Sequence, residues 1–211
     1  MNKAVSERNR KIGNVAREAL EARNFSPYYV NTKEEARNLS LSLIPEKHVV
    51  SWGGSMSIDE IGLLDEVKKK YKVIDRDVAK TIEERKQLMR QALLCDTYLC
   101  GSNAISESGE IVNVDGNGNR VSAMLYGPNS VIIVAGVNKI VKTLDDAISR
   151  ARNIAAPTNA QRFDIKTPCI KTGTCFNCNS DDCICCDIVI MRRCKEKNRI
   201  KVIIVGENLG F

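Results

Sequence analysis

The sequence is poor in histidine and in aromatic residues, and these shortages exclude several kinds of site. His48 is the single histidine among 211 residues, which argues against a Ser-His-Asp triad, a Cys-His pair and a histidine-rich metal centre. Aromatic residues make up 5% of the chain, too few for a platform on which nucleic-acid bases stack. The phosphate-binding Walker loop of nucleotide triphosphatases is also missing.

Long apolar runs and a strong excess of one charge are missing as well. No segment approaches the roughly 20 apolar residues of a membrane span, and the opening MNKAVSERNRKIGN lacks the apolar run of a secretory signal. The 32 basic and 26 acidic residues leave a net charge of +6 that is scattered along the chain. These features predict a cytoplasmic protein with neither nucleic acid nor membrane as a partner.

Short apolar runs alternate with helical segments, which predicts an α/β fold with a mixed, mostly parallel sheet. The expected strands are 48–52, 72–75, 97–101, 130–136 and 200–206. An apolar stripe predicts a helix over 2–24. A hydroxyl residue followed three positions later by Glu or Asp marks further helix starts at Thr32, Ser57, Thr81 and Thr143. Residues 110–115 and 121–127 flank a Gly-Asn-Gly-Asn sequence and are expected to form a β-hairpin.

The length and composition favour one domain in three parts. Residues 1–30 are expected to hold an amphipathic helix, and residues 31–165 the α/β region. Prolines and glycine near residue 168 then lead into a Cys-rich segment, 166–211, whose final strand completes the same domain.

The first candidate ligand loop is Trp52-Gly53-Gly54-Ser55-Met56-Ser57, between a predicted strand and a predicted helix. Glycines let a ligand approach the backbone, and a helix N-terminus presents free N–H groups to a phosphate or carboxylate. Gly53, Gly54, Ser55 and Ser57 are therefore candidate ligand-binding residues. A tight strand-to-helix turn is the alternative.

The second candidate loop follows the strand 97–101, where open α/β sheets collect their ligands. Gly101, Ser102 and Asn103 are small or polar residues at this place. Glu107 is the candidate catalytic group, as nucleophile or general base. A surface glutamate in a polar loop is the alternative.

Three further residues are candidates for contact with an anion. Arg120 closes the expected hairpin turn, and a guanidinium pairs well with carboxylate or phosphate. Asn138 and Lys139 lie in the loop before the helix that starts near Thr143. The alternative for each of these residues is that it only stabilises its own loop.

Seven of the nine cysteines crowd between Cys169 and Cys194. Thiolates at such short spacings converge on one zinc ion or one iron–sulfur cluster. Free thiols and disulfides are the alternatives, the latter requiring an oxidising compartment. The candidate metal ligands are Cys169, Cys175, Cys178 and Cys185.

Four stretches resemble the LUD-domain (lactate utilization) family: GGSMSIDEIGLL, SNAISESGEIVNVDGNGNRVSAMLYGP, GVNKIVKTLDDAISRARNIAAPTNAQR and TPCIKTGTCFNCNSDDCIC. The resemblance implies a three-layer, Rossmann-like fold of the NagB, ribose-phosphate isomerase and CoA-transferase superfamily, with helices on both faces of the sheet. Residues 106–109, Ser-Glu-Ser-Gly, look similar to the Ser-Glu-Asn-Gly motif of CoA transferases, with Ser108 replacing Asn. The resemblance to the LUD-domain family also implies that Cys185 is a stronger candidate for a metal ligand than Cys183.

Two functions follow. The first is a lactate-utilization-type protein that binds a small anionic metabolite (organic acid, sugar phosphate or thioester) at the carboxyl ends of the strands. It would act as an enzyme or as a subunit of an L-lactate-oxidising system. The alternative is an assembly or redox-partner protein that carries a metal or iron–sulfur cluster on its Cys-rich tail. The resemblance implies iron–sulfur redox proteins as partners, and a homodimer is expected.

Overall fold

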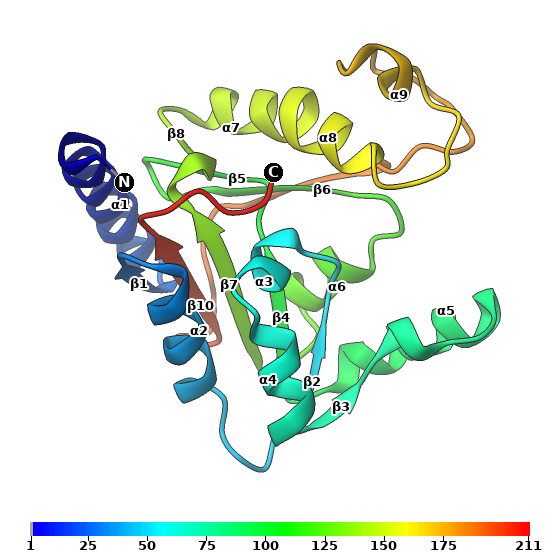
Figure 1. The fold of residues 1–211 in the computed structure, drawn as a ribbon, viewed down its shortest axis with the longest axis horizontal. Helices are drawn as coiled ribbons and strands as arrows, with labels where there is room; N and C mark the ends of the chain where they lie inside the picture. Colours follow the sequence, from blue (N-terminus) through cyan, green and yellow to red (C-terminus); the bar gives the residue numbers. More distant parts are fainter. Residues whose placement is uncertain (1) are drawn as a thin grey trace.

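The computed structural model describes residues 2–211, and its centre is a six-stranded sheet (Figure 1). The strand order is β1 (Ser26–Val30), β10 (Ile200–Val205), β7 (Ser130–Gly136), β4 (Thr97–Gly101), β2 (Val49–Trp52), β3 (Lys72–Ile74). Every neighbouring pair is parallel. The predicted α/β class with a mostly parallel sheet is therefore confirmed.

A second, four-stranded sheet lies across the carboxyl ends of the main strands (Figure 1). Its order is β8 (Ile140–Val141), β5 (Ala104–Ser106), β6 (Ile111–Asp115), β9 (Asp187–Met191). β6 runs antiparallel to both β5 and β9, and β5 is parallel to β8. Because β5 and β6 follow β4 directly, this second sheet covers the carboxyl ends of the main strands, where parallel sheets bind their ligands. We call the second sheet the roof.

Alternating side chains of the main sheet enter two hydrophobic cores, as expected for a sheet covered on both faces. On β7, Ile133 packs in the core that holds α1 (Lys3–Ala22) and α6 (Asn119–Leu125), whereas Ile132 and Val134 face the opposite core. That opposite core holds α2 (Lys33–Ser42), α3 (Met56–Glu60) and α4 (Leu63–Lys70). The fold thus has helices on both faces.

A helical rod covers the second sheet. It runs from α7 (Leu144–Arg150) through one π-helical stretch (Ala151–Ala155) into α8 (Ala156–Ala160). Alanines of the rod pack on Ala104, Val112 and Val114 of the sheet. The remaining α-helices are α5 (Ile82–Gln91), which has no buried residue and projects from the body, and the short α9 (Pro168–Thr172) (Figure 1).

Three of the four predicted helix starts are confirmed by side-chain capping bonds. The hydroxyls of Thr32, Thr81 and Thr143 each accept from the backbone N–H three residues on, at 3.1 Å. The start at Ser57 is wrong, because α3 begins after Ser55. Ser57 lies fully buried within the helix, and its hydroxyl accepts a hydrogen bond from Lys139 Nζ at 2.9 Å instead.

The predicted hairpin is also wrong, because 119–125 forms helix α6. Asp115 Oδ1 accepts from the backbone N–H of Asn117 and of Gly118, at 3.2 and 3.1 Å. Gly118 then adopts φ +71°, a left-handed conformation that glycine tolerates, and α6 follows at once. This turn leads from strand β6 into a helix, and β6 pairs with β5 and β9.

The terminal segments contribute strands to both sheets. Segment 1–30 holds α1, in agreement with the helix predicted over 2–24. The helix stops at Ala22, Asn24 has φ +64°, and β1 follows at Ser26. Segment 166–211 supplies β9 to the second sheet and β10 to the interior of the main sheet. Within residues 2–211, no helix is long and apolar enough to cross a membrane.

Candidate functional site

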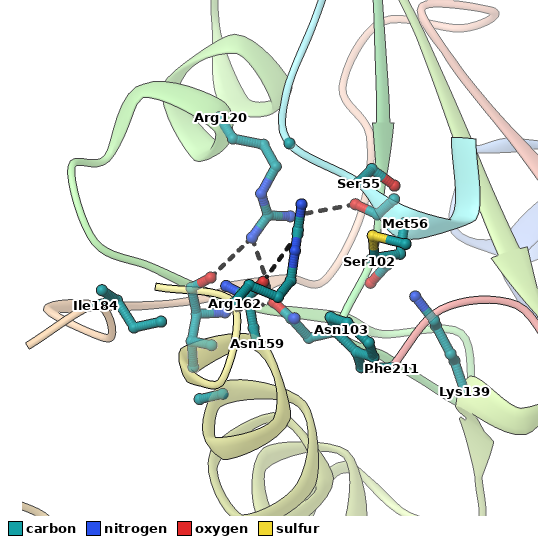
Figure 2. A pocket seen from close by; sticks show the side chains of 14 residues that line it. Ser55, Met56, Ser102, Asn103, Arg120, Lys139, Asn159, Arg162, Ile184 and Phe211 are labelled. Carbon is teal, nitrogen blue, oxygen red and sulfur yellow. Dashed lines mark hydrogen bonds between the residues drawn. The ribbon is translucent and has the colours of Figure 1, made fainter. Parts of the chain in front are cut away.

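A pocket of about 80 Å³ lies under the roof, at the carboxyl ends of β2, β4 and β7 (Figure 2). The ends of these strands and the loops that follow them form half of its wall. Strand β6, helices α6 and α8, the Cys-rich segment and the C-terminal segment contribute the other half. Its lining residues are Gly54, Ser55, Met56, Gly101, Ser102, Asn103, Val114, Arg120, Lys139, Ala156, Asn159, Arg162, Ile184 and Phe211.

Seven of the predicted ligand-binding residues meet in this pocket. They are Gly54, Ser55, Gly101, Ser102, Asn103, Arg120 and Lys139. Gly53 lines an adjoining outer cleft of about 250 Å³, which is also lined by the carboxylates of Asp59, Asp77 and Asp115. The residues that it shares with the inner pocket are Gly54, Arg120, Asn159 and Arg162. The two hollows thus form one cleft with an inner end and an outer mouth.

Two glycines make the inner wall compact. A Cβ atom on Gly101 would lie 2.6 Å from Ser55 Oγ, and one on Gly53 would lie 3.0 Å from Arg120 Cδ. Contacts this short leave no space for a side chain. The glycines therefore let the loops after β2 and β4 pack against each other and against Arg120.

Arg120 holds the pocket wall together through nearly all its donors. Nη1 donates to Asn113 Oδ1 at 2.6 Å and to Gly101 O at 3.2 Å, and Nη2 donates to Val114 O at 2.7 Å. Nε lies 3.4 Å from an oxygen of Asp115, whose side chain is 8% exposed. A guanidinium with this many internal partners acts chiefly as a positive scaffold.

Lys139 is the unusual charge of the site. Its side chain is 5% exposed, and Nζ donates to Ser57 Oγ at 2.9 Å. Within residues 2–211 no carboxylate oxygen lies within 4 Å of it. Burial, reinforced by the positive charges of Arg150 and Arg120, lowers the pKa of this lysine from 10.5 to about 7. Figure 2 shows its amine end directed toward Ser102 and Met56.

Arg150 and Asn138 brace the loops rather than line the pocket. The buried guanidinium of Arg150 donates to the carbonyl of Asn138 at 3.1 Å and to that of Asn103. Asn138 Oδ1 accepts from Leu209 N–H at 3.0 Å, which fastens the C-terminal segment beside Lys139. Asn138 therefore acts on the site through the position of its neighbours.

Glu107 lies outside this pocket. Its carboxylate pairs with Lys142 Nζ at 2.5 Å, and it borders an open hollow that also touches Asn138 and Arg150. The cause is local, because β5 turns the chain away from the end of β4 immediately after Asn103. The catalytic role of Glu107 stays a prediction, and the structure does not bring it together with the other candidates.

Seven lining residues were not among the candidate ligand-binding residues: Met56, Val114, Ala156, Asn159, Arg162, Ile184 and Phe211. Arg162 follows the end of α8, donates to Asn159 Oδ1 at 3.1 Å, and has an exposed side chain at the pocket mouth. Helix α8 begins with Pro157 near its first turn, so the polar residues behind this proline were the available signal. Phe211 gave no signal in the sequence.

The four predicted metal ligands line a second pocket beside the first. Cys169, Cys175, Cys178 and Cys185 share it with Phe176 and Ile188, and Ile184 borders both pockets. Cys183 Sγ lies 3.3 Å from Cys185 Sγ, whereas Cys169 Sγ lies 3.1 Å from the hydroxyl of Thr167. Among residues 2–211 no group of three or more metal-binding side chains has a ligand arrangement.

The thiols of this segment nevertheless influence one another. Burial, together with the neighbouring thiols of Cys183, Cys175 and Cys178, raises the pKa of Cys185 to about 12. At Cys183, burial opposes ionisation, but hydrogen bonds from Cys185 and other thiols outweigh it and lower the pKa. The buried Cys95 and Cys100 belong to the main core instead, where burial raises the pKa of each to about 12.

Fold and site together define a class: an α/β protein with a cationic small-ligand pocket at the carboxyl ends of its parallel strands. The chain matches the model of the LUD domain over residues 14–205. It therefore belongs to the LUD domain family, and the resemblance seen in the sequence is confirmed. Membership supports a protein related to lactate utilization.

Solved structures agree on the fold. A DUF162 family protein from Deinococcus radiodurans matches with a TM-score of 0.54 and 15% identity, over 93% of this chain and 98% of that chain. Weaker likenesses are to 5-methylthioribose 1-phosphate isomerase from Pyrococcus horikoshii OT3 (TM-score 0.38, 11% identity, 77% and 52% coverage) and to eIF2B delta from Chaetomium thermophilum (TM-score 0.32, 19% identity, 55% and 52% coverage). No functionally curated protein matches the sequence.

Proposed function

We propose that this chain binds a small organic acid in the pocket under the roof, as a ligand-binding or catalytic component of lactate utilization. The observation that carries the proposal is the charge of the wall. Arg120, Lys139 and Arg162 contribute to the lining, and no Asp or Glu side chain belongs to the lining set among residues 2–211. A cavity whose wall carries positive charges and few negative ones concentrates anions.

The polar groups of the wall suit a carboxylate. Ser55 and Asn159 add a hydroxyl and an amide to the wall that holds Lys139 and Arg162 (Figure 2), whereas the Ser102 hydroxyl already donates to the carbonyls of Ala104 and Val112. Since Arg120 spends its donors on the wall, Arg162 and Lys139 are the cations that remain for the ligand. The inner volume of about 80 Å³ favours a small acid, whereas the outer cleft has Asp59, Asp77 and Asp115 in its lining and suits an anion less well.

Arg162→Gln should weaken anion binding by about fivefold or more while leaving the fold intact. The variant removes a charge-assisted hydrogen-bond donor at the pocket mouth, where solvent screening reduces but does not abolish its effect. Binding is measured by isothermal titration with L-lactate, pyruvate, ribose 5-phosphate and inorganic phosphate, each tested separately.

The matched control is Arg90→Gln, which removes the same charge from an exposed position on α5. This variant should bind each anion as the unchanged protein does. If both variants lose affinity equally, only net charge matters and the pocket assignment is wrong. If none of the four anions binds the unchanged protein, the proposed function itself is overturned.

A second candidate function rests on a different observation, the gathering of thiols beside the pocket. We propose that the Cys-rich segment binds one metal centre through Cys175, Cys178 and Cys185. Four thiolates around a zinc ion, each about 2.3 Å from it, lie about 3.8 Å from one another. The 3.3 Å between Cys183 Sγ and Cys185 Sγ is close to that spacing, so Cys183 competes with the predicted Cys169 for the fourth place.

Protein prepared without oxygen should carry about one equivalent of zinc, or one iron–sulfur cluster, and Cys178→Ser should lose most of it. Elemental analysis and the visible spectrum measure this. Cys186→Ser is the control, because Cys186 is exposed and should retain the metal. Comparing Cys169→Ser with Cys183→Ser identifies the fourth ligand. Unchanged metal content in Cys178→Ser, or only a trace of metal in the unchanged protein, would leave the segment with free thiols.

A further inference from the structure

Lys139 is the one residue of the pocket lining that can gain or lose a proton near neutral pH. The other charged lining residues, Arg120 and Arg162, carry guanidiniums, and a guanidinium is not deprotonated in proteins. Lys139 is therefore the lining residue best placed for acid–base chemistry, and its amine joins the hydroxyls of Ser55 and Ser102 as a candidate nucleophile.

The surroundings of this amine favour its uncharged form. It is buried, its hydrogen-bond partner is the neutral hydroxyl of Ser57 at 2.9 Å, and the guanidiniums of Arg150 and Arg120 repel its charge. Glu60 is the acidic group that opposes this effect from α3, and its influence is weaker than that of burial or of either guanidinium. With a pKa of about 7, half of the amine is unprotonated at that pH, so it can act as a nucleophile.

The opposite side of the pocket supplies groups that can bind the carboxylate of a ligand. Arg162 and Asn159 stand across from Lys139 (Figure 2), so a carboxylate bound there need not lie on the amine. A ligand with a carbonyl next to its carboxylate would then present the carbonyl carbon toward Nζ. This arrangement separates the anchoring charge from the reacting group.

We propose that Lys139 forms an imine with a 2-oxo acid held by its carboxylate at Arg162. This inference rests on the proposed anion pocket and names its ligand class. The Nζ lone pair attacks the carbonyl carbon, and the carbonyl π electrons move to oxygen, which takes up a proton. The resulting carbinolamine loses this oxygen as water while nitrogen gives up its protons and forms the C=N bond. One water leaves for each imine formed, and no electrons are gained or lost.

Reductive trapping with pyruvate and cyanoborohydride at neutral pH tests the inference. Peptide mapping by mass spectrometry should find the reduced pyruvate adduct on Lys139, approaching one per chain. An exposed lysine with an ordinary pKa is unprotonated roughly a thousandfold less often than Lys139 at pH 7. Lys142, which is exposed in the adjacent loop, is the internal reference and should carry little adduct. Lys139→Arg should lose the adduct, whereas Lys142→Arg should keep it.

L-Lactate distinguishes failure of this step from failure of the pocket. It lacks the carbonyl, so it should compete with pyruvate and slow labelling of Lys139 without affecting exposed lysines. If titration shows that pyruvate and lactate bind but Lys139 is not labelled, or is labelled no faster than Lys142, the imine is overturned and the anion pocket stands. If neither acid binds and labelling is uniform over the surface, both proposals fail. If Lys139→Arg does not fold, the comparison of labelling at Lys139 and Lys142 in the unchanged protein still tests the imine.

Discussion

Lys139→Met should remove roughly 4 kcal/mol of pH dependence from the free energy of unfolding between about pH 7 and pH 10. The pKa of Lys139 is about 7 in the folded protein and 10.5 as its ordinary value. Between these values the folded chain releases the proton while the unfolded chain keeps it. Since the unfolded state then binds more protons, stability rises with pH across this window.

Below pH 7 both states hold the proton, and the folded protein bears the full cost of a buried, poorly paired ammonium. Methionine has a similar length and no charge, so the variant should be more stable than the unchanged protein at pH 6. The advantage should shrink toward pH 10, where only the lost bond to Ser57 separates the two proteins.

Urea unfolding at a series of pH values measures this prediction as the difference between the two proteins, so that groups common to both cancel. Lys86→Met is the control, because it removes the same charge from an exposed position on α5. If the Lys139→Met difference is the same at pH 6.5 and pH 9.5, the amine titrates as an ordinary lysine.

Arg120→Met should destabilise the protein by about 3–5 kcal/mol, the cost of breaking a buried ion pair by removing one partner. The side chains of Arg120 and Asp115 are 13% and 8% exposed. Without the guanidinium, the carboxylate of Asp115 stays buried without its cation. The carbonyls of Gly101 and Val114 and the amide oxygen of Asn113 lose a donor at the same time.

Two comparisons separate the causes of this loss in equilibrium unfolding. Arg162→Met removes a guanidinium from the same pocket but from an exposed position, and it should change stability little. Arg120→Lys keeps the charge but not the planar fork, so it should recover only part of the stability. A loss below about 1 kcal/mol in Arg120→Met would mean that water replaces the guanidinium and that the wall does not depend on it.

The main sheet could be predicted from sequence because its strands are continuous apolar runs, and both faces of such strands are buried. Val131 to Ala135 show this, since all five side chains are fully buried. Three of the four helix caps could be predicted because they depend on residues three positions apart, whereas Ser57 has the same spacing and lies inside α3. Strand β1 could not, because its pairing depends on β10, at the opposite end of the chain.

Helix α6 shows why local patterns failed. Val121, Ala123 and Leu125 alternate with other residues as in a strand, but Leu125 is 52% exposed while Met124 is fully buried. This segment forms a helix and not a strand because of contacts that sequence spacing does not reveal. Asp115 fixes the turn, and Arg120 reaches back from the first turn of α6 to the carbonyls of Gly101 and Val114.

Most of the pocket could be predicted because the carboxyl ends of parallel strands share one edge, whatever their distance in sequence. Gly54, Gly101 and Lys139 each follow such a strand. Arg162 comes from a helix that reaches the site only when the rod of α7 and α8 packs on the second sheet. Glu107 follows a strand as well, but β5 carries it past the edge.

The position of β10 has a consequence for how the protein is made. This strand is synthesised after all the other described strands, yet it lies inside the main sheet between β1 and β7. Until it leaves the ribosome, β1 has no partner in the described chain, and one edge of the apolar strand β7 stays open. Exposed edges and late, long-range pairing favour aggregation and slow folding. A nascent chain stalled before Ile200 would therefore present an unfinished sheet, a form that chaperones bind.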